Sequence, residues 1–533
     1  MEMSHIGHAT PLGETRAMSR LAQSSFCFAL LGLVTACGST VSLSGQAATG
    51  AGTNTSALSG ATSTDSGSTG ATSGTTTTGA QTSTNVTNPD GTTTSTIPSS
   101  TAGTNTTGPA TNGGSPVSAT IPATGKGWDQ KYVYIGVVTQ KDAQAAFAQF
   151  GAKNVDPGDS EAQANAVVSY LNSKGGLFGR QVKIKFRDVA TVSTATNADS
   201  TGAAVCTYFS QDNPVVAVLS IVTVMDYPSF RSCLARAKIP LFSATVKTVD
   251  DQASAQLSPY FYQTIAVSWN SLAPALVSRL SAQGWFGGWN TALGKPASTK
   301  AKVGILIDGT DTGTRVGQIV KKALAKAGYP DSLIYQYGDA SQGQQSSVFY
   351  FKGNGVTHVI VTDVELTAFQ TSANNQQYKP RYGITSYNDP YSNLEASGLT
   401  PAGANDGAMG VGYAPGLDVS DSNAPAPSAG SKTCIDLMKK AGQTFPNKRL
   451  AFAIAMSMCD GIMLTVKGAI AGGGLDGSSI YQGIQKLGPT YSPATGFRAA
   501  LSSTKRFVPG QARDLAYYPA CKCFKYRKGS VAL

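Results

Sequence analysis

Residues 131–190 constrain the fold more strongly than any other stretch of the sequence. They open with an apolar run rich in β-branched and aromatic residues, 132–138, which predicts a buried strand. A pattern with helical period begins at about Ser160 and ends at a Gly-Gly pair, 175–176, where glycine can close a helix C-terminus. A second strand is expected at 182–186, where apolar and polar residues alternate. Strand, helix and strand in this order predict a βαβ crossover and therefore a parallel sheet.

The rest of the chain up to about residue 490 continues this alternation of strands and helices. Further strands are expected at 215–219, 239–242, 302–307, 358–361 and 381–384. Further helices are expected at 203–209, 227–237, 272–280, 315–327, 366–374 and 450–471, with one more around Cys434. Alternation of this length predicts an α/β fold with two doubly wound sheets.

A specific string joins the helix and the second strand of the opening unit. Residues 172–180 read Asn-Ser-Lys-Gly-Gly-Leu-Phe-Gly-Arg and lead into a strand that ends in Arg187-Asp188. This combination resembles the type I periplasmic solute-binding proteins, and within them the branched-chain amino-acid (leucine/isoleucine/valine) receptor family of ABC importers. The resemblance runs, with gaps, from about Lys131 to Tyr526. It implies a two-lobed fold in which each lobe is a doubly wound parallel sheet and hinge crossings join the lobes.

About 400 residues remain once the N-terminal segments are set aside, which is more than one core comfortably holds. Crossings between lobes are expected at 259–264 and 412–416. The expected segments are lobe 1 at 128–262, lobe 2 at 263–411, a return to lobe 1 at 412–491 and a tail of lobe 2 at 492–533.

The N-terminus, residues 1–37, has the pattern of a bacterial lipoprotein signal peptide. Arg16 and Arg20 precede a short apolar stretch, 26–34, and small residues lead directly to Cys37. We expect Cys37 to be the lipidated first residue, so that the protein is extracytoplasmic and anchored to the outer face of the cell membrane. An ordinary signal peptide with a chance cysteine is the alternative. No other stretch of 18 or more apolar residues is found, so no transmembrane domain is expected.

Residues 38–127 are dominated by Thr, Ser, Gly, Ala and Asn, with almost no charge. Such a segment cannot bury enough apolar surface to offset the entropy lost on ordering, so a disordered tether is expected. Its r.m.s. span would be roughly 50 Å. The whole chain has 41 Lys and Arg against 30 Asp and Glu, a net charge of +11, but the basic residues are mostly scattered. A nucleic-acid partner is therefore not expected.

Six cysteines remain outside the signal peptide, and outside the cytoplasm an even number indicates disulfides. We expect sequence neighbours to pair, and a bridge at the first of these places also occurs in the resembling family. The pair with a single intervening residue is left open because its spacing strains it. The expected pairs are Cys206 with Cys233, Cys434 with Cys459, and Cys521 with Cys523.

Ligand in a parallel α/β sheet binds beyond the carboxyl ends of the strands, so the loops that follow the strands hold the candidate site. These loops are rich in hydroxyl, amide and carboxylate groups, which suit a polar solute. Ser and Thr in such loops also cap helices, and this alternative stays open. The candidate ligand-binding residues are Gln140, Ser220, Thr223, Ser243, Ala244, Thr245, Thr312, Asp363, Glu365 and Asn388.

The resemblance implies that the loops following two lobe 1 strands hold an α-carboxylate. Val224 and Lys247 stand about where that family uses hydroxyls in these loops, and Thr312 stands where it usually has a Tyr-Gly pair. Near Ser386 the family carries a glutamate for the α-ammonium, and none stands here. Asp363 and Glu365 are the acidic candidates in a neighbouring loop. The scaffold therefore matches the family well, whereas the residues at its ligand-contacting positions differ from those that hold an amino acid.

Catalysis is not expected from this sequence. Only three histidines occur, and His358 is the one outside the N-terminal segment. It stands at the head of an apolar strand, where a structural role is favoured over a catalytic one. No Gly-x-Ser-x-Gly motif supplies a nucleophile, and no zinc ligand set can be assembled. Neither a metal nor another cofactor is expected.

An insertion at 284–301 carries Trp285, Phe286 and Trp289, which are expected to pack against their own lobe rather than to contact a partner. The sequence as a whole predicts a solute-binding protein that delivers a small polar solute, amino-acid-like or an amide or carboxylate, to an ABC permease. The alternative is a surface sensor or adhesion receptor with the same two-lobed fold. A third hypothesis, an anchored hydrolase, is not favoured because the sequence shows no recognisable set of catalytic residues.

Overall fold

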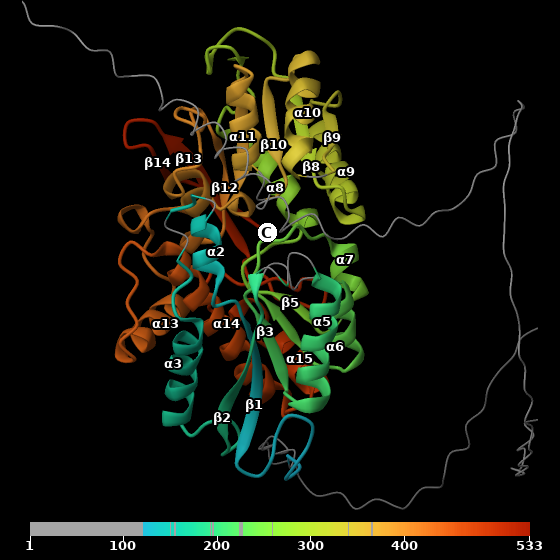
Figure 1. Cartoon of the computed structure of the whole chain (residues 1–533), viewed down its shortest axis with the longest axis vertical. Coiled ribbons are helices and arrows are strands. Elements are labelled where there is room, and N and C mark those ends of the chain that lie inside the picture. Colours follow the sequence, from blue (N-terminus) through green and yellow to red (C-terminus); the bar gives the residue numbers. More distant parts are fainter. Residues whose placement is uncertain are drawn as a thin grey trace, which may run out of the picture. The chain divides into compact units, whose positions relative to one another are not determined.

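A computed structural model describes residues 121–149, 151–153, 156–191, 193, 197–222, 228–257, 259–338, 340–363 and 366–533 (Figure 1). The expected signal peptide, the lipidation site Cys37 and nearly all of the expected tether lie outside the described residues. Strands of the described part form two large sheets, one of five strands and one of seven. We call the part built around the first sheet lobe 1 and the part built around the second sheet lobe 2. The residue boundaries proposed above for the lobes stay a prediction.

The sheet of lobe 1 is parallel throughout, as the βαβ unit predicts, and its strand order is β2-β1-β3-β4-β5. Tyr132 pairs with Gln181, and the register runs unbroken to Thr139 and Asp188. The middle strands are entirely buried, which explains their continuous apolar runs. The strands are β1 (Tyr132–Thr139), β2 (Gln181–Asp188), β3 (Ala217–Ser220), β4 (Leu241–Ser243) and β5 (Phe261–Gln263).

Helices cover both faces of this sheet (Figure 1). One face packs against α3 (Ser160–Ser173), α13 (Ala429–Lys440), α14 (Arg449–Gly472) and α15 (Gly477–Leu487). The other face packs against α5 (Ala198–Thr207) and α6 (Pro228–Arg236). The predicted disulfides are present: Cys206–Cys233 joins α5 to α6, Cys434–Cys459 joins α13 to α14, and Cys521–Cys523 closes a turn near the C-terminus. Two shorter helices, α2 (Ala143–Gln149) and α7 (Asp251–Gln256), follow β1 and β4.

The sheet of lobe 2 has the order β14-β13-β12-β11-β10-β8-β9 and differs from the prediction at one edge. Strands β8 to β12 are parallel, but β13 and β14 form an antiparallel hairpin that joins β12. The expectation of a purely parallel sheet is therefore wrong for the C-terminal tail. The strands are β8 (Val303–Ile307), β9 (Leu333–Gln336), β10 (His358–Val361), β11 (Arg381–Thr385), β12 (Met409–Gly412), β13 (Gln511–Tyr518) and β14 (Cys523–Ala532).

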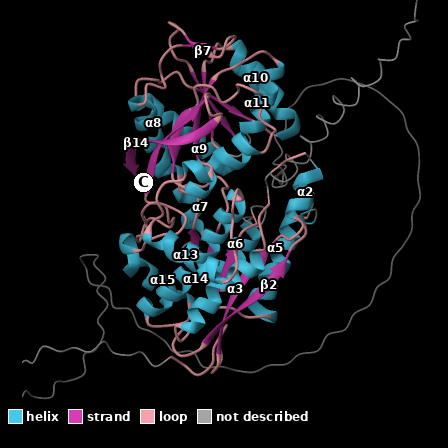
Figure 2. Ribbon diagram, turned by 90° about the vertical axis from the view of Figure 1, so that its left-hand side faces the viewer, coloured by secondary structure: helices cyan, strands magenta, loops and turns pink. Residues whose placement is uncertain are grey.

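Lobe 2 also has helices on both faces of its sheet. Two helices, α8 (Trp269–Ala282) and α9 (Asp311–Lys326), share one hydrophobic core with the strands. The other core involves α10 (Ala340–Gly353) and α11 (Leu366–Asn375), which Figure 2 shows on the opposite side of the strands from α8. The insertion forms a small antiparallel pair, β6 (Trp289–Asn290) with β7 (Lys295–Pro296).

The chain passes between the two sheets three times. The first crossing is 264–268, between β5 and α8, so the expected crossing at 259–264 largely contains a strand of lobe 1. The second is 413–428, between β12 and α13, and it includes the short helix α12 (Pro415–Asp418). The third is 491–510, between α15 and β13, a range that follows a single helical turn at Gly488–Thr490.

The crossings are bonded to one another and to lobe 1. Thr495 in the third crossing donates from its hydroxyl to the carbonyl of Thr264 in the first, at 2.6 Å. The buried carboxylate of Asp460 in α14 accepts hydrogen bonds from the hydroxyl of Tyr491 at 2.6 Å and the backbone N–H of Ala494 at 2.8 Å. Thr495 also donates to Asp460 from its backbone and its hydroxyl. The crossings therefore form one hydrogen-bonded bundle.

Two helices begin where an oxygen side chain accepts from the first turn. The side chain of Asp159 accepts from the backbone N–H of Ala162 at 2.9 Å, so Asp159 and not Ser160 caps α3. The hydroxyl of Thr310 accepts from the N–H of Gly313 at 3.0 Å, so α9 begins at Asp311, four residues before its expected start.

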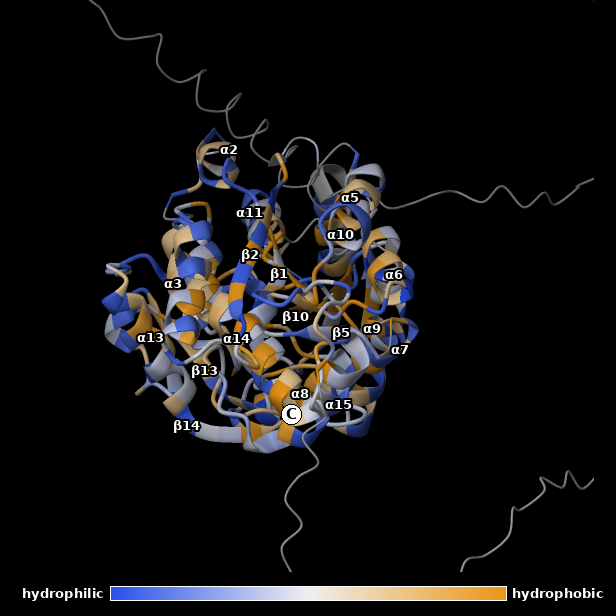
Figure 3. Ribbon diagram, turned by 90° about the horizontal axis from the view of Figure 1, so that it is seen from below, coloured by the Kyte–Doolittle hydropathy of each residue, from blue (hydrophilic) through white to orange (hydrophobic). Residues whose placement is uncertain are grey.

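The helix α14 is long and apolar enough to cross a membrane. This differs from the expectation that no stretch of this kind follows the N-terminal segment. Within the fold, however, 78% of its most apolar 18-residue window is buried. Figure 3 shows its hydrophobic colour gathered in the interior, whereas α3, α6 and α7 carry hydrophilic colour on the outside. This helix is therefore the central core helix of lobe 1.

The aromatic side chains of the insertion and His358 have structural roles, as predicted. The indole N–H of Trp285 donates to the carbonyl of Tyr382 at 2.9 Å, and the ring of Phe286 stacks on Tyr329. His358 is fully buried, and its Nε2 lies 2.8 Å from the carbonyl oxygen of Trp285. Burial lowers the pKa of His358 to about 4, so its ring is neutral at physiological pH.

Candidate ligand-binding site

Each sheet has a point where the strand order reverses, and the candidate residues lie near these points. In lobe 1 the reversal falls between β1 and β3, and in lobe 2 it falls between β8 and β10. Loops that leave neighbouring strands at such a point diverge to opposite faces of the sheet and leave room for a ligand. Gln140 follows β1, and Asp363 follows β10 after one intervening residue.

The candidate residues of lobe 1 gather at the ends of β1, β3 and β4. Ser220 ends β3, Ser243 ends β4, and the two residues pair in register. The hydroxyl oxygens of Ser243 and Thr245 lie 3.0 Å apart, and the N–H of Ala244 donates to the carbonyl of Ser220 at 2.8 Å. Both serines are fully buried and Thr245 is 2% exposed, whereas Ala244 and Gln140 are half-buried. Lobe 1 therefore holds a compact hydroxyl cluster at its strand ends.

The candidate residues of lobe 2 form a second cluster at the ends of β10 and β11. The side-chain amide of Asn388 donates to the carbonyls of Asp363 at 2.6 Å and Val361 at 3.1 Å. Its oxygen accepts from the N–H of Thr385 at 2.9 Å. The hydroxyl of Tyr337 donates to a carboxylate oxygen of Asp363 at 2.5 Å. Asn388 therefore holds the backbone that positions Asp363. No local sequence pattern distinguishes this structural role from contact with a ligand.

A direct hydrogen bond joins the loops that carry the two clusters. The hydroxyl of Thr248 in lobe 1 donates to the carbonyl of Thr362 in lobe 2 at 3.0 Å. Thr248 lies three residues after Thr245, and Thr362 immediately precedes Asp363. The loop that follows β4 is thus held against the loop that follows β10.

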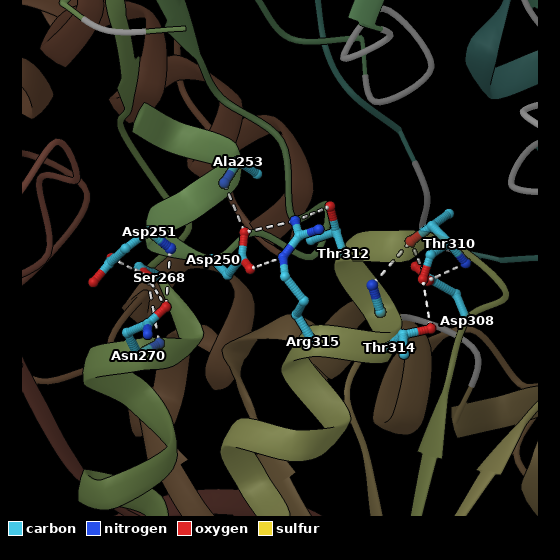
Figure 4. Close-up of polar contacts among 11 residues, drawn as sticks. Asp250, Asp251, Ala253, Ser268, Asn270, Asp308, Thr310, Thr312, Thr314 and Arg315 are labelled. Carbon is cyan, nitrogen blue, oxygen red and sulfur yellow. Dashed lines mark hydrogen bonds and ion pairs between the residues drawn. The ribbon is translucent and has the colours of Figure 1, made fainter. Parts of the chain in front are cut away.

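An ion pair makes a second connection between the lobes (Figure 4). Arg315 in α9 donates from Nε and from a terminal nitrogen to the two carboxylate oxygens of Asp250, at 2.5 and 3.1 Å. Another hydrogen bond from Arg315 reaches the hydroxyl of Thr312 at 3.1 Å. The side chain of Asp250 is 3% exposed and that of Arg315 is 29% exposed. The hydrogen bond with Asp250 raises the pKa of Arg315 above its usual value, so the guanidinium stays charged.

The start of α9 requires a glycine beside this pair. The hydroxyl of Thr310 donates to Asp308 at 2.5 Å while accepting from Gly313. A Cβ atom at Gly313 would lie 2.0 Å from the carboxylate oxygen of Asp308, which is far inside contact distance. Thr312 therefore sits on a tightly wound first turn and presents its hydroxyl to Arg315 (Figure 4).

Two of the candidate residues, Thr223 and Glu365, lie outside the described residues, as does Val224. Four residues that contact the clusters or join the lobes were not predicted from the sequence: Thr248, Asp250, Tyr337 and Arg315. Asp250 did carry a local signal, since an aspartate directly before a short helix is a typical N-cap. It accepts from the N–H of Ala253 at 2.8 Å, but its partner Arg315 is 65 residues away. Nothing local in the sequence pairs them.

Within the part of the chain that the structure describes, no group of three or more His, Cys, Asp or Glu side chains is placed to hold a metal ion. The clusters consist of hydroxyls, one carboxylate and backbone groups, together with the ion-paired Arg315. Such groups can orient a polar molecule by hydrogen bonds and charge.

No protein-family model matches the sequence, and no curated protein matches it. Solved structures do match its fold. A substrate-binding protein of an ABC transporter from Desulfitobacterium hafniense, in complex with Leu, superposes with a TM-score of 0.51 at 13% identity, over 74% of this chain and 100% of that one. A possible leucine/isoleucine/valine-binding protein from Rhodopirellula baltica SH 1 gives 0.51 at 14% identity, over 78% of this chain and 98% of that one.

A third match differs in the ligand that it carries. The solute-binding protein of an ABC transporter from Rhodopseudomonas palustris BisB5, in complex with 3,4-dihydroxybenzoic acid, gives a TM-score of 0.51 at 13% identity, over 75% of this chain and 97% of that one. All three share the arrangement of two α/β lobes that the opening βαβ unit and its Lys-Gly-Gly-Leu-Phe-Gly string predicted. The chain therefore has the two-lobed fold of the type I periplasmic solute-binding proteins.

Proposed function

We propose that the protein is an extracytoplasmic solute-binding protein, held on the outer face of the membrane by a lipid at Cys37, that delivers a small polar solute to an ABC permease. The observation that carries this proposal is the contact between the two lobes beside the strand-end clusters. The hydrogen bond from Thr248 to Thr362 and the ion pair of Asp250 with Arg315 hold the candidate loops of both lobes against each other. A solute bound between them would touch both lobes and favour the closed arrangement by its differential affinity.

The chemistry of the clusters supports a solute with hydrogen-bonding groups at both ends. In this proposal Ser220, Ser243 and Thr245 donate hydroxyl hydrogen bonds from lobe 1, and Asp363 supplies negative charge from lobe 2. An amino-acid-like solute, an amide or a carboxylate with a donor group fits this pattern. The proposed role is binding and delivery, in keeping with the substrate-binding and solute-binding proteins that share this fold.

A thermal-shift screen of the full chain tests the proposal. Amino acids, amides, ureas and aromatic acids are compared, since the solved structures of this fold carry ligands as different as Leu and 3,4-dihydroxybenzoic acid. A solute at one hundred times its dissociation constant should stabilise the protein by about 2.7 kcal/mol. The hit should lose affinity when Ser243 or Thr245 is replaced. Stabilisation by a protein partner alone, with no response to any small solute, would favour the receptor alternative.

A further inference from the structure

A cavity lies among the three crossings, apart from the strand-end clusters. It has a volume of about 200 Å³ and is lined by Ile265 of the first crossing, residues 415–416 and 424–428 of the second, and residues 494–497 of the third. Side chains of α13 and α14 complete the wall. We call this cavity the hinge pocket. None of the candidate ligand-binding residues lines it.

The wall of the hinge pocket is mainly apolar, with one buried cation. Phe452 and Met456 of α14 and Ile435 of α13 supply hydrophobic surface. Arg449, at the start of α14, has a side chain only 4% exposed, and its guanidinium lies over the ring of Phe452. No acidic side chain is among the residues that line the pocket.

One nitrogen of the Arg449 guanidinium makes no hydrogen bond among the described residues. One terminal nitrogen donates to Asp421 at 3.0 Å, and the other donates to the carbonyl of Pro415 at 2.5 Å. The Nε atom is buried and has no acceptor among the described residues. A buried N–H without a partner is costly, and an acceptor oxygen from a bound molecule would remove that cost.

The size and polarity of the pocket define the class of ligand. A dry cavity of about 150 Å³ is enough to bind benzene, so the hinge pocket has room for one ring or a short alkyl chain together with a small polar group. Arg449 is ion-paired with Asp421, and its free Nε–H suits an acceptor oxygen such as that of a carboxylate at that end. A free amino acid is disfavoured, because its ammonium group would find no acidic side chain on the wall.

We propose that the hinge pocket binds a small apolar monocarboxylate and that its occupancy biases the opening of the two lobes. All three crossings contribute to the wall, so a ligand there contacts every segment whose backbone must bend when the lobes separate. A ligand that fits the pocket in the present arrangement stabilises that arrangement by its differential affinity. This second site does not rest on the proposed transport role.

The test uses the full chain and sodium benzoate as the probe, with calorimetric titration as the measurement. Ala426 is an exposed loop residue that lines the pocket, so Ala426→Trp should fill the pocket and lower benzoate affinity at least tenfold. Ala429 is exposed, begins α13 and does not line the pocket, so the matched control Ala429→Trp should stay within twofold of the natural protein. Benzyl alcohol, which lacks the carboxylate, should bind at least tenfold more weakly than benzoate.

Two further variants locate the bound benzoate. Thr245→Val alters the strand-end cluster and should leave benzoate affinity within twofold. Arg449→Lys keeps the charge but removes the Nε donor, and it should weaken binding if the variant folds. If instead Thr245→Val weakens benzoate and Ala426→Trp does not, the probe occupies the strand-end site and the proposed hinge site is wrong. Absence of saturable binding would also overturn it.

Hydrogen exchange measures the coupling to lobe opening. Saturating benzoate should slow exchange in all three crossings, 264–268, 413–428 and 491–510, because the ligand favours the arrangement in which they pack together. Slowing that is confined to α13 and α14 would show a pocket without influence on the hinge, and that part of the proposal would fail.

Discussion

Thr245 illustrates how one buried hydroxyl can serve either ligand binding or folding. Its oxygen lies 3.0 Å from that of Ser243, and the side chain is almost fully enclosed. Each hydroxyl has one hydrogen to donate, so in such a pair at least one hydrogen is directed to some other acceptor. In the proposed function Thr245 also forms a hydrogen bond with the solute.

Replacing Thr245 by Val removes this hydroxyl with little change in volume. Solute affinity should fall by about 1–3 kcal/mol, because a buried acceptor on the solute loses its partner. Isothermal titration gives the affinity and urea denaturation gives the stability of the unliganded form. Thr465→Val is the matched control: this buried hydroxyl donates to the carbonyl of Gly461 within α14 at 2.9 Å, so only stability should change. Unaltered affinity in Thr245→Val would remove it from the binding site.

Two buried carboxyl groups give the protein a predictable response to pH. Burial raises the pKa of Asp418 to about 7. Hydrogen bonds from Tyr526 at 2.5 Å and Ala414 at 3.0 Å act in the opposite direction and only partly offset the rise. Burial likewise raises the pKa of Asp389 to about 7, and the negative charge of Asp418 adds to the shift. Because the folded-state pKa values exceed the ordinary value of 3.8, the neutral acids favour the folded state. Their stabilisation is complete below pH 4 and is lost as the pH rises through 7.

The free energy of unfolding should therefore contain a contribution that declines between about pH 4 and pH 7, by at most about 1.4 kcal/mol per pH unit for each group. Urea denaturation across this range measures it. Asp418→Asn mimics the neutral acid and should flatten the decline. The control Asp436→Asn, which replaces an exposed carboxyl, should leave the decline unchanged. An unchanged slope in Asp418→Asn would mean that this carboxyl does not titrate as described.

At the scale of single elements, the parts that could be predicted are those encoded locally. The apolar run of β1, the face of α3 and the Gly-Gly stop are patterns within a few residues of one another, and they appear where expected. The hairpin of β13 and β14 was missed because its strands are defined by pairing with β12, about 100 residues earlier. The ion pair of Asp250 with Arg315 was missed for the same reason. The site residues were selected only as strand ends, so bracing side chains such as Asn388 could not be separated from ligand contacts.

A disulfide should stabilise the fold more when it encloses a longer stretch of chain. Cys206–Cys233 spans 27 residues, and its removal by replacing both cysteines with Ala should cost about 3–4 kcal/mol in the chain-entropy model. Cys521–Cys523 spans only 2 residues, so the same double replacement there should cost clearly less. Mass mapping of the unreduced protein checks the pairing, and urea denaturation checks the order. Equal losses would contradict this account.

The ion pair between the lobes should raise solute affinity by favouring the closed arrangement. Arg315→Met leaves Asp250 buried without its partner and should destabilise closure by about 1–2 kcal/mol, which lowers affinity roughly five- to thirty-fold. The matched control is Lys432→Met, which breaks an exposed ion pair with Asp436 inside α13 and should leave affinity unchanged. Titration with the solute found in the screen measures both. Equal affinity in Arg315→Met would show that the pair does not contribute to closure.

For the whole molecule, the proposed anchor sets where binding takes place. Cys37→Ala should move the protein from the membrane fraction to the soluble fraction, because a lipidated cysteine is the proposed attachment. Fractionation followed by immunoblotting measures the shift, and Cys27→Ala serves as the control within the signal segment. A distribution that does not change in Cys37→Ala would exclude this residue as the lipid site.

The ion pair of Asp250 with Arg315 should also affect the rates at which solute binds and dissociates. It joins the lobes without any contribution from a solute, so a molecule can enter only during intervals when the pair is broken. The association rate constant then scales with the fraction of open molecules, and dissociation waits for the same rupture. High ionic strength weakens a partly exposed pair. Salt should therefore quicken both the capture and the release of solute.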